Sequence, residues 1–194
     1  AAKEAIDRVV PELVRGLVAS SIAAQDPDLW GADAESEAAI RLGWTEAPAI
    51  SRSLLPEIAA LRASFLAQGV DRFVLCGMGG SSLAPEVIAA TYGVPLTILD
   101  STDPAQVADA IAELGRTAVV VSSKSGSTLE TDSQKRAFEA AAEAAGIDPA
   151  GRVVVVTDPG SPLDAAAREA RYRVFNADPD VGGRYSALTA FGLV

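Results

Sequence analysis

The stretch Phe73-Val-Leu-Cys-Gly-Met-Gly-Gly-Ser-Ser-Leu-Ala-Pro-Glu86 contains the pattern that decides the fold: an apolar run, a glycine-rich turn and the start of a helix. A short apolar run bounded by glycine is typical of a buried strand, and the residues that follow, Ser82–Tyr92, are typical of a helix. A strand that leads through a tight loop into a helix is the repeating unit of parallel sheets. The stretch therefore predicts an α/β fold.

The same alternation continues to the end of the sequence. The predicted strands are Phe73–Cys76, Leu96–Leu99, Ala118–Ser122, Val153–Thr157 and Tyr172–Phe175. The predicted helices are Ser82–Tyr92, Pro104–Leu114, Leu129–Ala145, Pro162–Ala170 and a last helix that begins near Arg184. Asp103 and Ser161 are good N-caps because a side-chain oxygen can accept from a free helix N–H, and each precedes a proline that a first helical turn accepts. The pattern predicts a doubly wound parallel sheet of five strands.

For the residues before position 70 the sequence predicts helices and no strands. The predicted helices are Pro11–Ala24, with Pro11 in the first turn, a short one at Ser36–Leu42, and Ser51–Gln68. We therefore divide the chain into a helical extension or connector, residues 1–69, and the α/β domain, residues 70–194.

The composition excludes several classes of function. The chain has 194 residues, with 16 basic against 26 acidic side chains, a net charge of −10 and no Lys/Arg cluster, so nucleic acid is not an expected partner. It contains no histidine, which excludes mechanisms that need an imidazole from this chain. Its single cysteine, Cys76, allows no internal disulfide and suits a cytoplasmic protein. No apolar run approaches the roughly 20 residues that span a membrane.

Two loops predict an anion site. Gly77–Ser82 follows the first predicted strand, and Ser122–Thr128 follows the third. Ligands of parallel sheets bind beyond the carboxyl ends of the strands, and each loop leads into a helix whose free N–H groups attract anions. In a 2-1-3-4-5 strand order the two loops lie at the same crevice, and this arrangement favours phosphate as the ligand. Lys124 would contribute either its charged side chain or its backbone N–H alone. Ordinary tight turns and helix caps are the alternative.

Two other phosphate motifs fit less well. A Walker A loop is excluded because the lysine precedes Ser125-Gly126 instead of following a glycine. A dinucleotide fingerprint is matched by Gly77 and Gly79 with Ser82 at the third glycine position, and Asp100 stands where a ribose-binding acid would. That alternative stays open, although it leaves the second loop unexplained.

A third stretch, Asp180-Val-Gly-Gly-Arg-Tyr-Ser186, places an arginine at the start of a predicted helix. A cation is unfavourable there, so Arg184 predicts an anionic ligand or transition state, unless it pairs with Asp178 or Asp180. Trp30, Trp44 and Tyr185 could line a site, or belong to the core.

These motifs resemble the phosphoglucose isomerase family in their order and separation. They are Gly77-Met-Gly-Gly-Ser-Ser-Leu-Ala-Pro-Glu86, Ser123-Lys-Ser-Gly-Ser-Thr-Leu-Glu-Thr131 and Val181-Gly-Gly-Arg-Tyr-Ser186. The first of them, with Asp100-Ser-Thr-Asp-Pro104, looks most like the isomerase part of bifunctional transaldolase/glucose-6-phosphate isomerases. The resemblance extends over about residues 40–194.

The resemblance implies a sugar isomerase (SIS) domain of flavodoxin-like topology that interconverts glucose 6-phosphate and fructose 6-phosphate through an enediolate. Arg184 would stabilise the enediolate. The residues that would hold the substrate phosphate are Ser81, Ser123, Lys124, Ser125 and Thr128, and the substrate loops would include Gly79, Gly80, Gly182 and Gly183. The family also implies no metal or other cofactor, a homodimer, no membrane partner and, in the bifunctional proteins, a fused transaldolase domain.

Several departures from the family lead to further expectations. Ser125-Gly-Ser127 stands where members often carry Thr-Phe-Thr, and Pro179 replaces a polar residue. The family's catalytic glutamate, ring-opening histidine and C-terminal lysine have no counterpart here, and the sequence stops at Val194 inside an apolar stretch. We therefore expect the first SIS domain of a longer isomerase, inactive alone. A non-catalytic SIS module that senses a sugar phosphate and a dinucleotide oxidoreductase are the alternatives.

Overall fold

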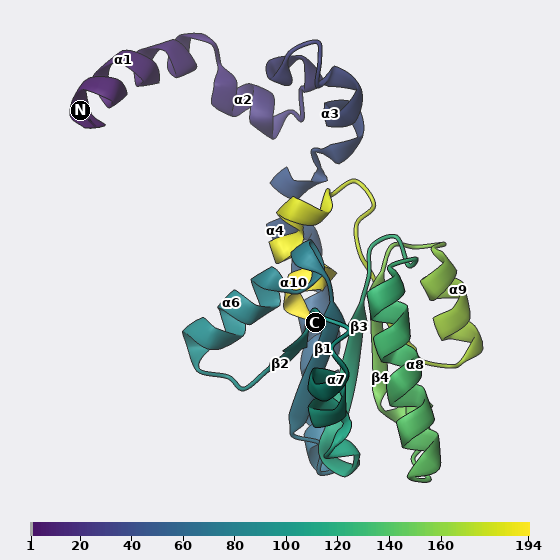
Figure 1. Cartoon of the computed structure of the whole chain (residues 1–194). Helices are drawn as coiled ribbons and strands as arrows, with labels where there is room; N and C mark the ends of the chain where they lie inside the picture. The colour runs from purple at the N-terminus through teal and green to yellow at the C-terminus, as the bar shows by residue number, and fades with distance from the viewer. Residues whose placement is uncertain (1) are drawn as a thin grey trace.

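The structure is a computed structural model that describes residues 2–194. A helical N-terminal segment leads into a parallel sheet with helices packed around it, and α1 and α2 lie away from the sheet (Figure 1).

The described residues form one five-stranded sheet with the order β2-β1-β3-β4-β5, in which every neighbouring pair is parallel. The strands are β1 (Arg72–Gly77), β2 (Thr97–Leu99), β3 (Thr117–Ser122), β4 (Val153–Thr157) and β5 (Arg173–Asn176). Each predicted strand is confirmed to within one residue at either end. The order is the flavodoxin-like one, and it differs from the dinucleotide-binding order, in which the first three strands lie together on one side.

The helices after residue 70 also follow the prediction. They are α6 (Leu83–Tyr92), α7 (Pro104–Ile111), α8 (Leu129–Ala144), α9 (Pro162–Glu169) and α10 (Ala190–Leu193). The Asp103 side chain accepts from the N–H groups of Ala105 and Gln106, and Ser161 accepts from Asp164, so both predicted caps are confirmed. The predicted helix near Arg184 is instead a 3-10 segment, Gly183–Leu188, followed by α10.

The N-terminal helices match the prediction at Ser36–Leu42, to within one residue, and in part at Ser51–Gln68, but not at Pro11–Ala24. The structure has α1 (Ala2–Arg15), α2 (Val18–Ala23), α3 (Glu35–Arg41), α4 (Ala47–Ser51) and α5 (Leu55–Ala67). The single helix predicted at Pro11–Ala24 is wrong, because Leu17 adopts a left-handed conformation with φ 52° between α1 and α2. Pro11 lies inside α1 instead of in its first turn. Neither α1 nor α2 has a buried residue, so no packing holds one continuous helix across Gly16, a poor helix former.

Alternate residues of the strands build two apolar layers, one on each face of the sheet. On one face Leu75 and Val120 pack with Phe65 of α5 and Phe191 of α10. On the other face the strand side chains pack with α7, α8 and α9; the buried members include Val74, Cys76, Val119, Val121, Ala110, Phe138 and Ala167. Cys76 belongs to this core, and burial raises the pKa of its thiol to about 12.

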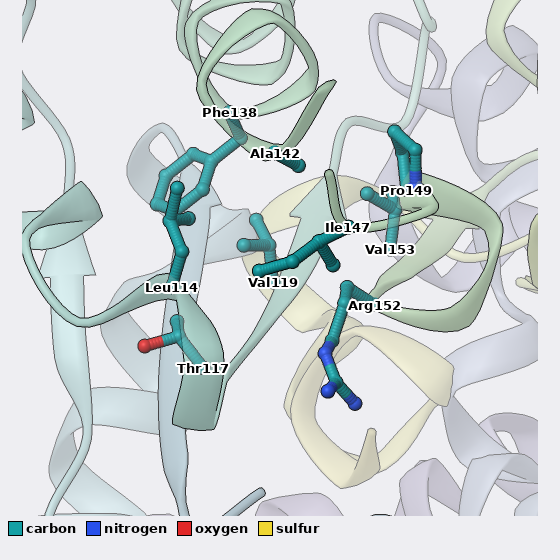
Figure 2. A pocket seen from close by; sticks show the side chains of 9 residues that line it. All are labelled: Leu114, Thr117, Val119, Phe138, Ala142, Ile147, Pro149, Arg152 and Val153. Carbon is teal, nitrogen blue, oxygen red and sulfur yellow. The ribbon is translucent and has the colours of Figure 1, made fainter. Parts of the chain in front are cut away.

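A small void lies in the second layer, below α8 (Figure 2). Apolar side chains such as Phe138, Ile147 and Val153 line it, and the Arg152 guanidinium points away from them. Its volume of about 10 Å³ is at the lower limit for one water molecule, so it is a packing defect and no ligand site. Within residues 2–194, no helix has the length and apolar character needed to cross a membrane.

Candidate functional site

The two predicted anion loops lie at the same edge of the sheet. Gly77 at the end of β1 pairs in register with Ser122 at the end of β3, so the loops that follow start side by side. Gly79–Ser81 forms a 3-10 turn that leads into α6, and Thr128 is the N-cap residue of α8. Both loops therefore present backbone N–H groups near a helix N-terminus, which is the arrangement that binds anions.

The second loop is held by its own hydroxyl groups. The Ser123 side chain is buried, and its Oγ lies 3.1 Å from Oγ1 of Thr128. Ser125 is exposed, and its Oγ accepts from the N–H of Ser127 at 3.3 Å. The backbone of Ser123 also donates to Val156 of β4 at 3.0 Å. These bonds fix the loop on the sheet edge before any ligand arrives.

The ammonium group of Lys124 is paired with a carboxylate of this chain. Its Nζ lies 2.9 and 2.7 Å from the two carboxylate oxygens of Asp158 and donates to the carbonyl of Asp178 at 3.3 Å. Both charged side chains are about one-fifth exposed. The sequence left open whether Lys124 offers its charge or only its N–H, and in the structure the charge is paired with Asp158.

The third motif packs directly on the first loop. A Cβ on Gly80 would overlap the backbone carbonyl of Gly183, so the absence of a side chain at residue 80 lets the two backbones approach closely. Ser186 Oγ donates to Gly183 O at 2.6 Å. Gly182 and Gly183 both have open space where a Cβ would lie. The close approach explains the need for glycine at residue 80 and places the motif that carries Arg184 beside the anion loops.

Arg184 is exposed and has no ion-pair partner in the described part of the chain. The pairing with Asp178 or Asp180, which the sequence left open, is therefore not formed. An unpaired guanidinium is available to an anionic ligand, and its planar group suits an oxyanion.

A cavity of about 460 Å³ opens beside Arg184, within the size range of small-molecule sites. Its lining residues are Trp30, Ala34, Glu37, Ala38, Arg41, Leu42, Trp44, Lys124, Gly182, Gly183, Arg184 and Tyr185. Four predicted site residues thus line it. The other six, Gly79, Gly80, Ser81, Ser123, Ser125 and Thr128, lie in the adjacent loops outside its lining.

The sequence did not predict the cavity wall formed by residues 30–44, apart from noting its tryptophans. Trp44 stacks on Tyr185 with ring centroids 5.6 Å apart, and both rings line the cavity with Trp30. The signal that could have found this wall is the pair of tryptophans in the predicted connector. Residues 2–194 contain no cluster of three or more His, Cys, Asp or Glu side chains that could hold a metal ion.

Comparison with known proteins agrees with the motifs. No family model matches the chain. A curated glucose-6-phosphate isomerase from Thermus thermophilus is 36% identical over 160 residues, which cover 79% of this chain and 38% of the relative. The resemblance to the phosphoglucose isomerase family is confirmed. The chain spans about 24% to 38% of the length of the glucose-6-phosphate isomerases it matches.

Solved structures show the same relation to glucose-6-phosphate isomerases. A hypothetical protein from Thermus thermophilus has a TM-score of 0.76 and 32% identity, covering 98% of this chain and 44% of that chain. The glucose-6-phosphate isomerase of Chlamydia trachomatis has a TM-score of 0.64 and 32% identity, covering 80% of this chain and 30% of its own. A tagatose-6-phosphate ketose/aldose isomerase from Escherichia coli shares the fold at 12% identity and a TM-score of 0.51. The flavodoxin-like SIS fold expected from the sequence is confirmed.

Proposed function

We propose that this chain supplies the phosphate-binding and oxyanion-binding groups of an aldose–ketose isomerase that interconverts glucose 6-phosphate and fructose 6-phosphate. The observation that carries the proposal is the meeting of the Gly77–Ser82 loop, the Ser122–Thr128 loop and the Arg184 segment at one edge of the sheet. The relation to glucose-6-phosphate isomerases supports the substrate class.

Each part of the site has a role in this reaction. The N–H groups and hydroxyls of the two loops, from Ser81, Ser123, Ser125 and Thr128, would hold the phosphate without a full charge from Lys124, whose ammonium Asp158 neutralises. Arg184 would face the oxyanion that forms when a proton leaves C2 of the sugar, because an unpaired guanidinium stabilises developing negative charge. The chain has no histidine, so a ring-opening imidazole would have to come from another segment or subunit.

A binding comparison tests the proposal and separates it from the alternatives. We expect glucose 6-phosphate to bind more tightly than inorganic phosphate, and NAD or NADP not to bind, as followed by calorimetry. Arg184→Lys should weaken sugar-phosphate binding while leaving inorganic phosphate unchanged, since a point charge cannot replace the planar group. Binding of a nicotinamide dinucleotide in preference to glucose 6-phosphate would contradict the proposal and favour the oxidoreductase.

Turnover separates an enzyme from a sensing module. In an isomerase assembled with this chain, Arg184→Lys should lower kcat far more than it raises KM, because the guanidinium acts on the enediolate. A loss through KM alone would show that Arg184 only binds substrate, as a sensor would require. The homodimer and the fused transaldolase domain stay predictions of the same resemblance.

A further inference from the structure

The segment Arg41–Thr45 holds the strand-like stretch that leads to Arg184, although the two are about 140 residues apart in the chain. The Arg41 guanidinium donates to the carbonyl of Pro179 at 2.7 Å, and the Gly43 N–H donates to Asp180 at 3.2 Å. Leu42 and Val181 form an antiparallel bridge, and both are buried. Figure 1 shows the C-terminal segment, in yellow, beside the chain between α3 and α4.

The contact is close enough to restrict both backbones. A Cβ added to Gly43 would lie 3.2 Å from the Asp180 Cβ and its carbonyl oxygen, and 3.3 Å from Oδ2 of Asp178. Gln25 also holds the segment, since its Nε2 donates to the Leu42 carbonyl at 3.3 Å and to Oγ1 of Thr45 at 3.0 Å. The Arg41–Thr45 segment is therefore anchored both to residues 179–181 and to Gln25.

The stack of Trp44 on Tyr185 extends this contact to the residue next to Arg184. The rings are 5.6 Å apart with 25° between their planes. Tyr185 is 61% exposed, and Gly182 and Gly183 before it have open space where a Cβ would lie. The backbone here is held by the Tyr185 N–H, which donates to Gly182 at 2.9 Å, and by Ser186 Oγ, which donates to Gly183 at 2.6 Å. The aromatic stack adds the side-chain contact at residue 185 itself, next to Arg184.

We propose that Trp44 is a positioning residue that holds the Gly182–Tyr185 segment, and through it Arg184, in the place where a sugar phosphate is bound. The inference rests on the proposed function for the identity of the ligand, but the positioning itself does not depend on it. Trp44 reaches Arg184 through Tyr185 and lies on the wall of the same cavity. Loss of the indole should therefore weaken the contacts that Arg184 makes with the sugar part of the ligand. The contacts of the two loops with the phosphate group should stay unchanged.

Hydrogen exchange of the whole chain without ligand tests the positioning directly. We expect Trp44→Ala to raise the exchange rates of the amides at residues 183–186 about three- to tenfold, and Trp44→Phe to restore rates near those of the wild type. Trp30→Ala is the matched control, because it removes another cavity indole that stacks on no ring in the described chain. Equal rates in Trp44→Ala and wild type would overturn the proposal.

Binding of two ligands separates positioning from general damage. With Trp44→Ala we expect the Kd of glucose 6-phosphate to rise about three- to tenfold while the Kd of inorganic phosphate stays the same. An equal loss for both ligands would overturn the proposal, since it indicates a general structural role. Arg41→Met, which removes the hydrogen bond to Pro179, should also raise the Kd of glucose 6-phosphate and leave the Kd of inorganic phosphate unchanged. This variant replaces Trp44→Ala in the test if Trp44→Ala does not fold. A wild-type chain that binds phosphate but not glucose 6-phosphate would contradict the proposed function, while the exchange rates still decide the role of Trp44.

Discussion

The loop after β1 and the loop after β3 occupy equivalent places at the sheet edge, yet they are held in different ways. Gly77–Ser82 is held by close backbone packing, since Gly77 lies against Ser81 and Ser122, and Gly80 lies against Gly183. Ser122–Thr128 is held by polar side chains, namely the Ser123–Thr128 pair and the Lys124–Asp158 ion pair. One loop depends on the absence of side chains and the other depends on their presence.

This difference predicts how each loop responds to substitution. Adding one methyl group to the first loop forces two backbones apart, whereas deleting one hydroxyl from the second loop removes a single hydrogen bond. Overpacking of this kind costs about 1–3 kcal/mol, and a lost hydrogen bond costs about 1 kcal/mol. The substitutions below are ordered accordingly.

Gly80→Ala should have the largest effect. The new Cβ would overlap the Gly183 backbone, so we expect the free energy of unfolding to fall by about 2–3 kcal/mol and sugar-phosphate binding to weaken. Gly151→Ala is the matched control, because no atom lies within 4 Å of its added Cβ, and it should change stability by less than about 0.5 kcal/mol. Denaturant unfolding measures both variants. Equal effects of the two would show that the approach of Gly80 to Gly183 is not a constraint.

Breaking the Lys124–Asp158 pair should come next. Asp158→Asn leaves a half-buried ammonium without its carboxylate, so we expect a loss of about 1–2 kcal/mol in the free energy of unfolding. It also frees the charge of Lys124, which should tighten inorganic phosphate binding. A double-mutant cycle with Lys124→Met measures the coupling. A coupling energy near zero, with unchanged phosphate affinity, would mean that the pair neither holds the loop nor neutralises its charge.

Ser123→Ala should cost about 1 kcal/mol, because it removes the partner of Thr128 inside the loop. The control is Ser127→Ala, since Ser127 is exposed and bonds only to the exposed Ser125. Thermal unfolding and phosphate titration of both variants check the expectation. Ser127→Ala as damaging as Ser123→Ala would contradict the idea that the buried hydroxyl pair holds the loop.

The smallest effect is expected at low pH, where the support beneath the second loop titrates. A Cβ on Gly126 would meet Ser161 and Leu163 of the α9 start, and Asp164 in α9 accepts from the Gly160 N–H at 2.9 Å. That bond, with help from Asn176 and Arg168, lowers the pKa of Asp164. A carboxyl group with a lowered folded pKa stabilises the fold above its unfolded pKa and loses this contribution as pH falls through the folded value.

Asp164→Asn should therefore flatten the pH dependence of unfolding below about pH 4. Chemical denaturation at a series of pH values measures the slope for the variant and the wild type. A variant slope as steep as that of the wild type over this range would assign the acid lability to other carboxyl groups.

The sequence predicted those parts of the fold that are determined by residues close together in the chain. Strands such as Val153–Thr157 are buried on both faces and so appear as continuous apolar runs, and Asp103 caps its own helix. The break at Leu17 was missed because the apolar spacing continues through it, although neither α1 nor α2 has a buried residue. The spacing of apolar residues indicates a preference for helix, but tertiary contacts decide whether one long helix forms.

The sequence predicted the two loops of the candidate site but not the cavity wall formed by residues 30–44. The two loops follow neighbouring strands, so their place at one edge of the sheet could be predicted from the sequence. Their binding of phosphate stays a prediction. Arg41 and Pro179 are 138 residues apart, and Lys124 and Asp158 are 34 apart, so neither contact has a local pattern. The pairing of Lys124, in particular, could not be chosen over a phosphate contact without the fold.

Titration of the isotopically labelled chain with glucose 6-phosphate, followed by amide NMR, tests the central claim that the ligand's phosphate lies between the two loops. We predict saturable shifts of the amides at residues 79–83 and 123–129, with inorganic phosphate moving the same amides and glucose 6-phosphate also moving those at residues 182–185. Saturable binding that shifts only amides elsewhere in the chain, or the absence of binding at millimolar ligand, would contradict it.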